Sequence, residues 1–571
     1  MLARVPPRLH GLVRPVVFAA GGLLALAVAV AAPSTTLLPG PHGLVETLVA
    51  AAALSGAFAV GAARPLESLY GLVLLTVVEG AIRKWIVNDI TIFLLKDMLA
   101  LGIYAAVLPA AAPRALRRPW WLVAPLAGIV LLAILSVPLT AAISQAAVGL
   151  RSYVIYLPLL WVAPLLLTTQ RRLSVLLIGF LTIGAIEAVF TMVQALAGPG
   201  VLNKLVSGSL PGMITLSGVA YIRPTGTFMQ TGVMAAFLFF AVLAALSVVA
   251  IAPGRRLRTA GFSSLVLLTS GVVYGSARSL LGSLLLLTVP TIVYLMARRR
   301  FARALGIPAA FAAGLVLVLG VVPAVRDAGA RSVEWLQDRD LTTVAVEQLD
   351  GRRIVIRIER DDLPRLDECD ARLDAKRLDG TRVVVRITRP CGGQESQRVA
   401  ITAAAEGSSA PGGGFLGRAA DFNKAGGKIG IWGGRIRPQL DLIADQRLVG
   451  HGTGTLSLGS GYAVETVSFQ GEGMYSKLAW ELGLPGFALF AWFLVALLVL
   501  AFKGVLRARD WECPVAGVAL GVAAIMPLWY LFTFALDFPI VGISGYLFAG
   551  CAIWYAVRPS DGDAARPRSG S

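Results

Sequence analysis

The chain has 571 residues, of which 56% are hydrophobic and 15% are charged, and its mean hydropathy is +0.74. A soluble domain carries about 25% charged residues, so this composition excludes a soluble globular protein and indicates a membrane protein. The formal net charge of +18 does not indicate nucleic-acid binding, because no DNA- or RNA-binding motif accompanies it. Loop arginines that fix the topology and attract anionic lipid explain it better.

Apolar segments of membrane-crossing length recur along nearly the whole chain. About 20 apolar residues cross a ~30 Å hydrocarbon core, and backbone groups in lipid must be hydrogen-bonded internally, so such segments form helices. We therefore predict an all-α polytopic bundle of about 12–14 transmembrane helices. The candidate spans are Leu12–Ala32, Gly43–Ala62, Leu66–Ile82, Ile90–Pro109, Trp120–Ile143, Ala146–Thr168, Leu173–Ala197, Met229–Ala252, Gly261–Gly275, Ser279–Ala297, Ala304–Val325, Leu478–Ala501, Pro514–Leu536 and Phe538–Val557.

The first span has an alternative interpretation as a signal peptide. Arg4 and Arg8 precede it and Arg14 lies at its start, and small residues lie near its end at Ala29–Ala32, which fits a cleavage site. An uncleaved anchor fits the spans that follow, and removal of the segment would not change the topology downstream.

Basic residues gather on one side of the predicted bundle. Short cytoplasmic loops carry an excess of lysine and arginine, and each basic cluster after the first span follows an even-numbered span. We therefore expect both termini in the cytoplasm. The clusters are Arg64; Arg114, Arg117 and Arg118; Arg171 and Arg172; Arg255, Arg256 and Arg258; Arg298, Arg299, Arg300 and Arg303; Lys503, Arg507 and Arg509; and Arg558, Arg566 and Arg568.

These boundaries divide the chain into four parts: the first eleven spans (1–325), a large extracytoplasmic loop (326–477), the last three spans (478–557) and a disordered cytoplasmic tail (558–571). Long segments are translocated regardless of their charge. Within the loop, LDGRRIVIRI from Leu349 is followed by LDGTRVVVRI from Leu378. An Asp-Gly turn followed by apolar/basic alternation is typical of a β-strand, so we predict a β-rich insert at about 342–402.

The four cysteines divide between the loop and the helices. Cys369 and Cys391 share the loop, which would permit a disulfide outside the cytoplasm, whereas Cys513 and Cys551 fall at or within helices.

Two arginines lie beside helix breaks on the side opposite to the basic clusters. Arg223 is in YIRPTGTF just before the eighth span, and Arg278 is in GSARS within a tight hairpin. A guanidinium group donates in a fixed fork that matches phosphate oxygens in pairs. Each arginine could instead extend to lipid head groups or cap a carbonyl. Two such residues on one face favour a site that holds a polyanion.

The loop ends with further candidates. Arg435 follows GG, and His451 lies in GHGTGTLSLGSG, which lacks the strand–GxGxxG–helix context of a nucleotide site. Glu472 is expected at the outer mouth of the twelfth span and Glu481 one to two turns inside, and either could act as a base or pair with an arginine. The acidic segment 361–374 lacks the spacing of a Ca²⁺ loop, so we expect no metal and no cofactor.

The ordered set of these motifs resembles the O-antigen ligase and O-antigen or exopolysaccharide polymerase superfamily of bacterial inner membranes. The similar parts, over 223–500, are RPTGTF, SARS, GGR, GHGTGT and YSKLAWELGLPG. The resemblance implies a metal-independent glycosyltransferase with a GT-C-like fold, whose substrate is glycan on undecaprenyl pyrophosphate. It also implies that Arg223, Arg278 and Arg435 hold the pyrophosphate; Tyr475 is a further candidate for substrate binding.

The chain departs from the family at one functional position. Ligases of this family carry a His-Asn pair just before the helix that contains the ELGLPG-like turn, and here the place reads GEGMY with Glu472 near the histidine position. The departure favours a polymerase over a ligase and leaves Glu472 and His451 as candidate bases.

We therefore expect an inner-membrane enzyme that transfers glycan at the outer leaflet, with a lipid-linked donor and a glycan or lipid-linked acceptor in the bilayer. Other polysaccharide assembly proteins could be partners, and a structural subunit of such an assembly is a further reading. The main alternative is a polysaccharide or lipid flippase. A flippase would need discontinuous helices near the midplane, and Glu187 and Lys96 would line its path.

Overall fold

The computed structural model describes residues 43–86, 90–115, 119–140, 143–197, 213–216, 219–222, 224–252, 254–275, 278–318, 341–349, 352–359, 372–379, 382–388, 397–401, 450–453, 455, 473–530 and 539–558. Several predicted features lie outside these residues. They are the first span, Arg223, Arg435, Glu472, Cys369, Cys391 and the tail after Arg558.

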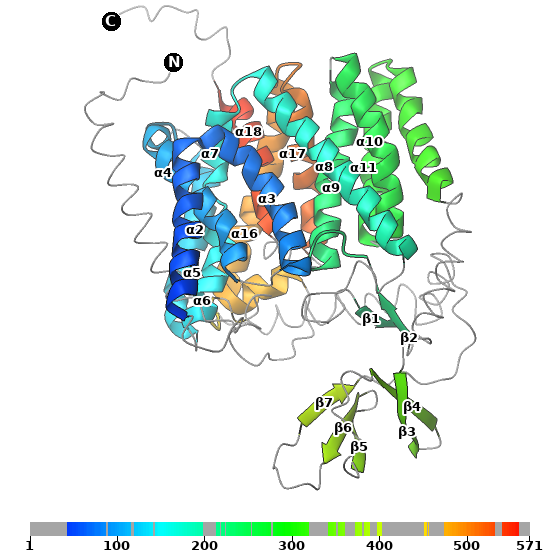
Figure 1. Cartoon of the computed structure of the whole chain (residues 1–571). Coiled ribbons are helices and arrows are strands. Elements are labelled where there is room, and N and C mark those ends of the chain that lie inside the picture. The colour runs from blue at the N-terminus through cyan, green and yellow to red at the C-terminus, as the bar shows by residue number, and fades with distance from the viewer. Residues whose placement is uncertain are drawn as a thin grey trace, which may run out of the picture.

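The chain forms a multi-span, all-α membrane bundle (Figure 1). In the part that is described, nine helices are long and apolar enough to cross a membrane, or ten if one bent pair counts as a single span. Three more apolar helices are shorter, over Thr47–Ala63, Gly282–Ala297 and Cys513–Trp529. Each predicted span after the first coincides with one of these helices or with the bent pair.

The first half of the bundle contains α2 (Gly43–Ala63), α3 (Pro65–Trp85), α4 (Ile90–Ala115), α5 (Trp120–Leu135), η1 (Val137–Leu139), α6 (Ile143–Val154), α7 (Leu159–Leu166) and α8 (Gln170–Ala197). The second half contains α9 (Thr231–Ile251), α10 (Arg255–Tyr274), α11 (Arg278–Ala297), a helix over Phe301–Val318, α16 (Met474–Arg507), α17 (Cys513–Trp529) and α18 (Pro539–Val557).

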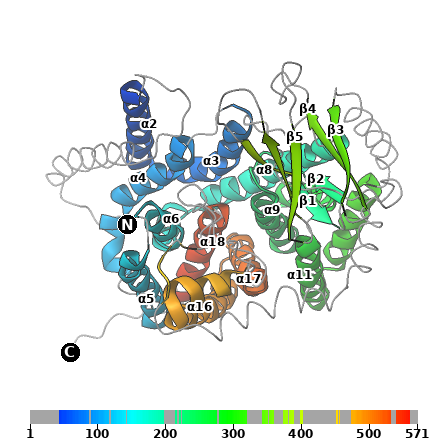
Figure 2. The same ribbon diagram turned by 90° about the horizontal axis from the view of Figure 1, so that it is seen from below.

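The core of the bundle is built around α9 and α18. Almost all of α9 is buried, and it packs against α8, α10, α11, α17 and α18. Its sequence is apolar on every side, which is the composition of a helix enclosed by other helices. Figure 2 views the bundle from the end at which β1 and β2 lie, and there α18 is in the middle and α2 at the periphery.

Within the described ranges, seven strands form three small antiparallel sheets. One pairs β1 (Met213–Leu216) with β2 (Val219–Ile222), and a second pairs β3 (Leu341–Leu349) with β4 (Arg352–Glu359). The third has the order β5–β6–β7, over Arg372–Asp379, Arg382–Thr388 and Gln397–Ile401. The two copies of the repeat contribute β4 and β6, which begin directly and one residue after the respective Asp-Gly pair.

Two breaks interrupt otherwise continuous spans. The predicted span Ala146–Thr168 consists of α6 and α7, whose axes are bent by 44°. The break coincides with Pro158, at the N-terminus of α7, where a proline removes a helical donor and fixes φ. The second break is in α16, where Gly483 has φ +72° and ψ −179°, two residues before Pro485.

Candidate functional site

Most polar contacts among the described residues gather at one end of the bundle, which we call the motif end. There α3, α8, α10 and α17 finish and α4, α6, α9, α11 and α16 begin. The Met474 backbone N–H donates to the Tyr530 carbonyl at 2.7 Å, and the Trp529 indole N–H donates to the Ser283 hydroxyl at 2.7 Å. These bonds join the starts of α16 and α11 to the end of α17.

The residues directly after Arg223 form a buried turn, Pro224–Thr227, which we call the PTGT turn. The Lys84 ammonium at the end of α3 donates to the Thr225 hydroxyl at 2.6 Å and to the Gly226 carbonyl at 2.9 Å. The Gln194 amide near the end of α8 pairs with Gly226 in both directions, at 2.8 and 2.9 Å. Two helices distant in the sequence, α3 and α8, therefore hold this turn in one conformation.

The carboxylate of Glu187 completes the attachment of the PTGT turn. It accepts from the Thr227 backbone N–H at 2.7 Å and from the Thr227 hydroxyl at 2.9 Å. Glu187 is 1% exposed within α8, and a carboxylate at such a position is costly unless it meets a partner. The sequence shows no local partner for Glu187, because Thr227 lies 40 residues further along the chain.

Two glycines near the predicted arginine motifs lie next to a single side chain. A Cβ atom on Gly226 would lie 3.4 Å from Met234. A Cβ atom on Gly275 would lie 2.8 Å from the Met234 methyl group. Met234 is fully buried in the first turn of α9. The PTGT turn and the end of α10 therefore pack against the same methionine.

A buried ionic network continues from α3 across α4 to α6. Glu79 pairs with Arg83 at 3.3 Å and with Lys96, and Asp97 forms a bidentate pair with Arg151. Glu79 and Arg83 are four residues apart on α3, a spacing at which opposite charges meet on one helix face. The neighbours Lys96 and Asp97 each pair with a different helix.

Positive charge exceeds negative charge in this region. The region contains four cations and three carboxylates, namely Arg83, Lys84, Lys96 and Arg151 against Glu79, Asp97 and Glu187. The Phe93 ring adds a neutral partner, with the Lys96 ammonium 3.8 Å and the Arg151 guanidinium 4.1 Å from its centroid. The described part of the motif end thus carries a net positive charge, which favours an anionic ligand.

Replacing Asp97 with leucine is expected to destabilise the protein by about 3–5 kcal/mol, because it leaves the Arg151 guanidinium buried without its carboxylate. Combining it with Arg151→Met should recover most of this loss, since a buried ion pair replaced by apolar residues is often nearly neutral. SDS-titration unfolding in mixed micelles measures both variants and their coupling. Equal stability of the single and double variants would contradict the importance of the pair.

The residues Gly450–Thr453 form a second turn, which we call the GHG turn, and it docks on the break in α16. The His451 backbone N–H donates to the Trp480 carbonyl at 2.7 Å, and the Gly452 N–H donates to the Glu481 carbonyl at 3.3 Å. Pro485 has no N–H, so the Glu481 carbonyl four residues earlier cannot receive the usual helical bond. The ELGLPG motif thus exposes carbonyl groups that the GHG turn occupies.

The GHG turn begins with Gly450 because the backbone there lies very close to the Glu481 carbonyl group of α16. A Cβ atom on Gly450 would lie 2.2 Å from the Glu481 carbonyl oxygen, so only glycine lets the turn reach the helix. Beyond it, the Thr453 hydroxyl donates to the Ala133 carbonyl of α5 at 2.7 Å and also contacts Ser136. The GHG turn is therefore held between α5 and α16.

The side chain of Glu481 links α16 to α6. The Tyr153 hydroxyl donates to the Glu481 carboxylate at 2.7 Å, and the Lys477 ammonium lies 5.5 Å from the Tyr153 ring centroid. Tyr153 is two residues after Arg151, so α6 connects the ionic network to α16, the helix on which the GHG turn docks.

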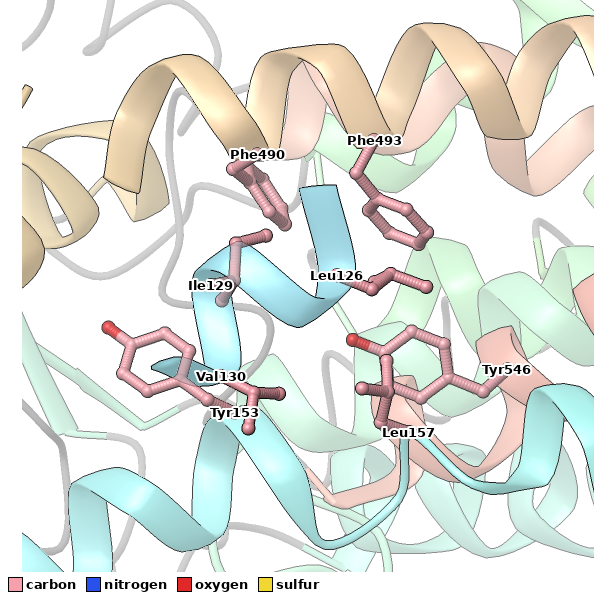
Figure 3. Close-up of a pocket in the computed structure, with 8 residues that line it drawn as sticks. All are labelled: Leu126, Ile129, Val130, Tyr153, Leu157, Phe490, Phe493 and Tyr546. Carbon is pink, nitrogen blue, oxygen red and sulfur yellow. The ribbon is translucent and has the colours of Figure 1, made fainter. Parts of the chain in front are cut away.

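Next to this contact is a small apolar pocket (Figure 3), from which the Tyr153 hydroxyl points away. The pocket is lined by Leu126, Ile129, Val130, Tyr153, Leu157, Phe490, Phe493 and Tyr546.

The structure describes part of the predicted site. The His451 ring is exposed and stacks on the Trp480 ring, with centroids 3.9 Å apart and planes at 10°. The Tyr475 hydroxyl donates to the Pro527 carbonyl of α17 at 3.0 Å, so this phenol is engaged within the bundle. Arg278 begins α11. Arg223, Arg435 and Glu472 lie outside the described residues, as do Cys369 and Cys391, whereas Cys513 begins α17 and Cys551 lies within α18.

The sequence analysis missed several residues of the motif end, namely Lys84, Gln194, Tyr153 and Met234. Lys84 alone carried a signal, as a cation outside the basic clusters. Among the described residues, no group of three or more His, Cys, Asp or Glu side chains could hold a metal ion.

The chain matches no protein-family model and no curated protein.

Proposed function

We propose that the chain is a bacterial inner-membrane glycosyltransferase that joins glycan carried on undecaprenyl pyrophosphate at the outer leaflet, as a polymerase rather than a ligase. The observation that supports this proposal is that Gly226 and Gly275 both lie next to Met234, because a Cβ atom built on either glycine would lie within 3.4 Å of the Met234 side chain. Arg223 comes three residues before Gly226 and Arg278 three residues after Gly275 in the sequence, which favours two arginines that bind one diphosphate. The net positive charge of the ionic network favours the same anion.

The chemistry follows from the residues in these positions. A hydroxyl of the acceptor attacks the anomeric carbon of the donor, a new glycosidic bond forms, and the bond from that carbon to the pyrophosphate oxygen breaks. Arg223, Arg278 and Arg435 stabilise the negative charge that develops on the leaving pyrophosphate, which is the largest contribution in many enzymes. Glu472 or His451 takes the hydroxyl proton, and Tyr475 supports the substrate.

One observation favours the second candidate, a flippase for lipid-linked glycan. The span formed by α6 and α7 is broken and bent by 44°, and discontinuous helices are typical of transporters. Two contacts count against a path through the charged residues. Glu187 is bound to the PTGT turn and Lys96 is paired with Glu79, so both groups are already engaged.

Reconstitution separates the two functions. The purified chain in proteoliposomes with lipid-linked repeat units is expected to convert them into longer chains, observed as a ladder after mild acid release of the glycan. Repeat units that change leaflet while keeping their length would favour the flippase. The Arg278→Ala variant, purified and reconstituted in the same way, controls for contaminating enzymes in the membrane extract.

A further inference from the structure

The exposed imidazole of His451 is held by one carbonyl oxygen. Its Nδ1 lies 3.3 Å from the Trp480 carbonyl oxygen, which also accepts the His451 backbone N–H at 2.7 Å. A carbonyl oxygen only accepts hydrogen bonds, and it has two lone pairs to do so. A hydrogen bond in this geometry requires the hydrogen on Nδ1, and the neutral ring then presents an unprotonated Nε2.

The break in α16 is what makes this arrangement possible. Gly483 leaves helical geometry and Pro485 lacks an N–H. The carbonyl groups of Trp480 and Glu481 therefore accept hydrogen bonds from the GHG turn and not from the next turn of α16. The stacked indole of Trp480, 3.9 Å from the imidazole centroid, fixes the plane of the ring.

We propose that the α16 break fixes His451 in its Nδ1–H form, so that Nε2 takes the proton of the acceptor hydroxyl, with Trp480 as the positioning residue. This inference rests on the proposed function and assigns the base to His451 rather than Glu472. As the glycosidic bond forms, the hydroxyl proton moves to Nε2, the pyrophosphate leaves with the electron pair of the broken bond, and the imidazolium later returns its proton to water.

The tautomer can be measured without any activity assay. The chain has three histidines, His10, His42 and His451, so ¹⁵N-histidine labelling gives a small set of imidazole signals in solid-state NMR spectra of the reconstituted protein. The signals lost in His451→Asn belong to His451. We expect a protonated Nδ1 and an unprotonated Nε2. A protonated Nε2 with a bare Nδ1 would overturn the inference.

The proton-acceptor role is tested with substitutions that separate structure from chemistry. His451→Asn keeps a side-chain N–H for the Trp480 carbonyl but offers no basic nitrogen, so glycan extension should fall about 100-fold or more at unchanged protein level. Imidazole added to His451→Ala should restore part of the rate. The matched control is His42→Asn, the same change just before α2.

Two results would overturn the base assignment: full extension by His451→Asn, or a larger loss in Glu472→Gln than in His451→Asn. A wild-type chain that forms no glycosidic bonds would refute the proposed function and the proton-acceptor role together. The tautomer measurement would then still decide whether the α16 break fixes the imidazole.

Discussion

Alanine at Gly226 is expected to dislodge the PTGT turn and to remove most glycan extension, with a loss of about 3 kcal/mol in unfolding free energy. Gly226 has φ +61°, where a side chain costs about 1–2 kcal/mol. The new Cβ atom would also lie 1.6 Å from the Glu187 carboxylate, and overpacking of this kind costs about 1–3 kcal/mol. SDS-titration unfolding and the proteoliposome extension assay measure the two effects.

A control on the same helix as Glu187 isolates the cause. A Cβ atom on Gly179 of α8 would meet nothing within 4 Å, so Gly179→Ala should leave stability unchanged or raise it by about 0.5–1 kcal/mol, as alanine does in a helix interior. In a Glu187→Ala background the added cost of Gly226→Ala should shrink, because the clashing carboxylate is gone. Wild-type stability of the single Gly226→Ala variant would show that the turn is not fixed as described.

The helices were predictable because each needs only local information. An apolar run long enough to cross the membrane is visible in the sequence, and the predicted Met229–Ala252 and Gly43–Ala62 differ by at most two residues per end from α9 (Thr231–Ile251) and α2 (Gly43–Ala63). The alternation of basic clusters then supports the number of spans. The break between α6 and α7 was not predicted, although Pro158 marks it, because prolines are tolerated in membrane helices.

The partners of the buried charged residues were not predictable, because they come from distant segments. No side chain on the same helix turn holds the Glu187 carboxylate. Its donors belong to Thr227, which comes after the end of α8 and after β1 and β2 in the sequence. Lys96 and Asp97 are adjacent, and which helix each one faces depends on how α3, α4 and α6 pack. The sequence alone also does not reveal that Gly226 and Gly275 pack against the same methionine, because that contact depends on how α9 and α10 are placed in the bundle.

Loss of the Arg278 side chain is expected to lower the rate of glycan extension about 10²–10³-fold, the usual effect of removing one group that stabilises transition-state charge. Arg278→Lys should fall between Arg278→Ala and the wild type, because lysine keeps the charge but not the fork that binds two phosphate oxygens at once. Rates at several donor concentrations in proteoliposomes, with protein level held equal, separate kcat from KM.

The relation between the two arginines provides the sharper test of that prediction. If Arg223 and Arg278 hold the same diphosphate, their alanine substitutions should not be additive, because groups that act as a unit lose most of their effect with the first removal. Arg256→Ala is the matched control, since Arg256 is exposed in the first turn of α10, at the opposite end of that helix from Gly275. Additive losses would show that the two arginines bind separate anions. Unchanged extension in both single variants would show that neither arginine binds the diphosphate during the reaction, even though the surrounding helices carry a net positive charge.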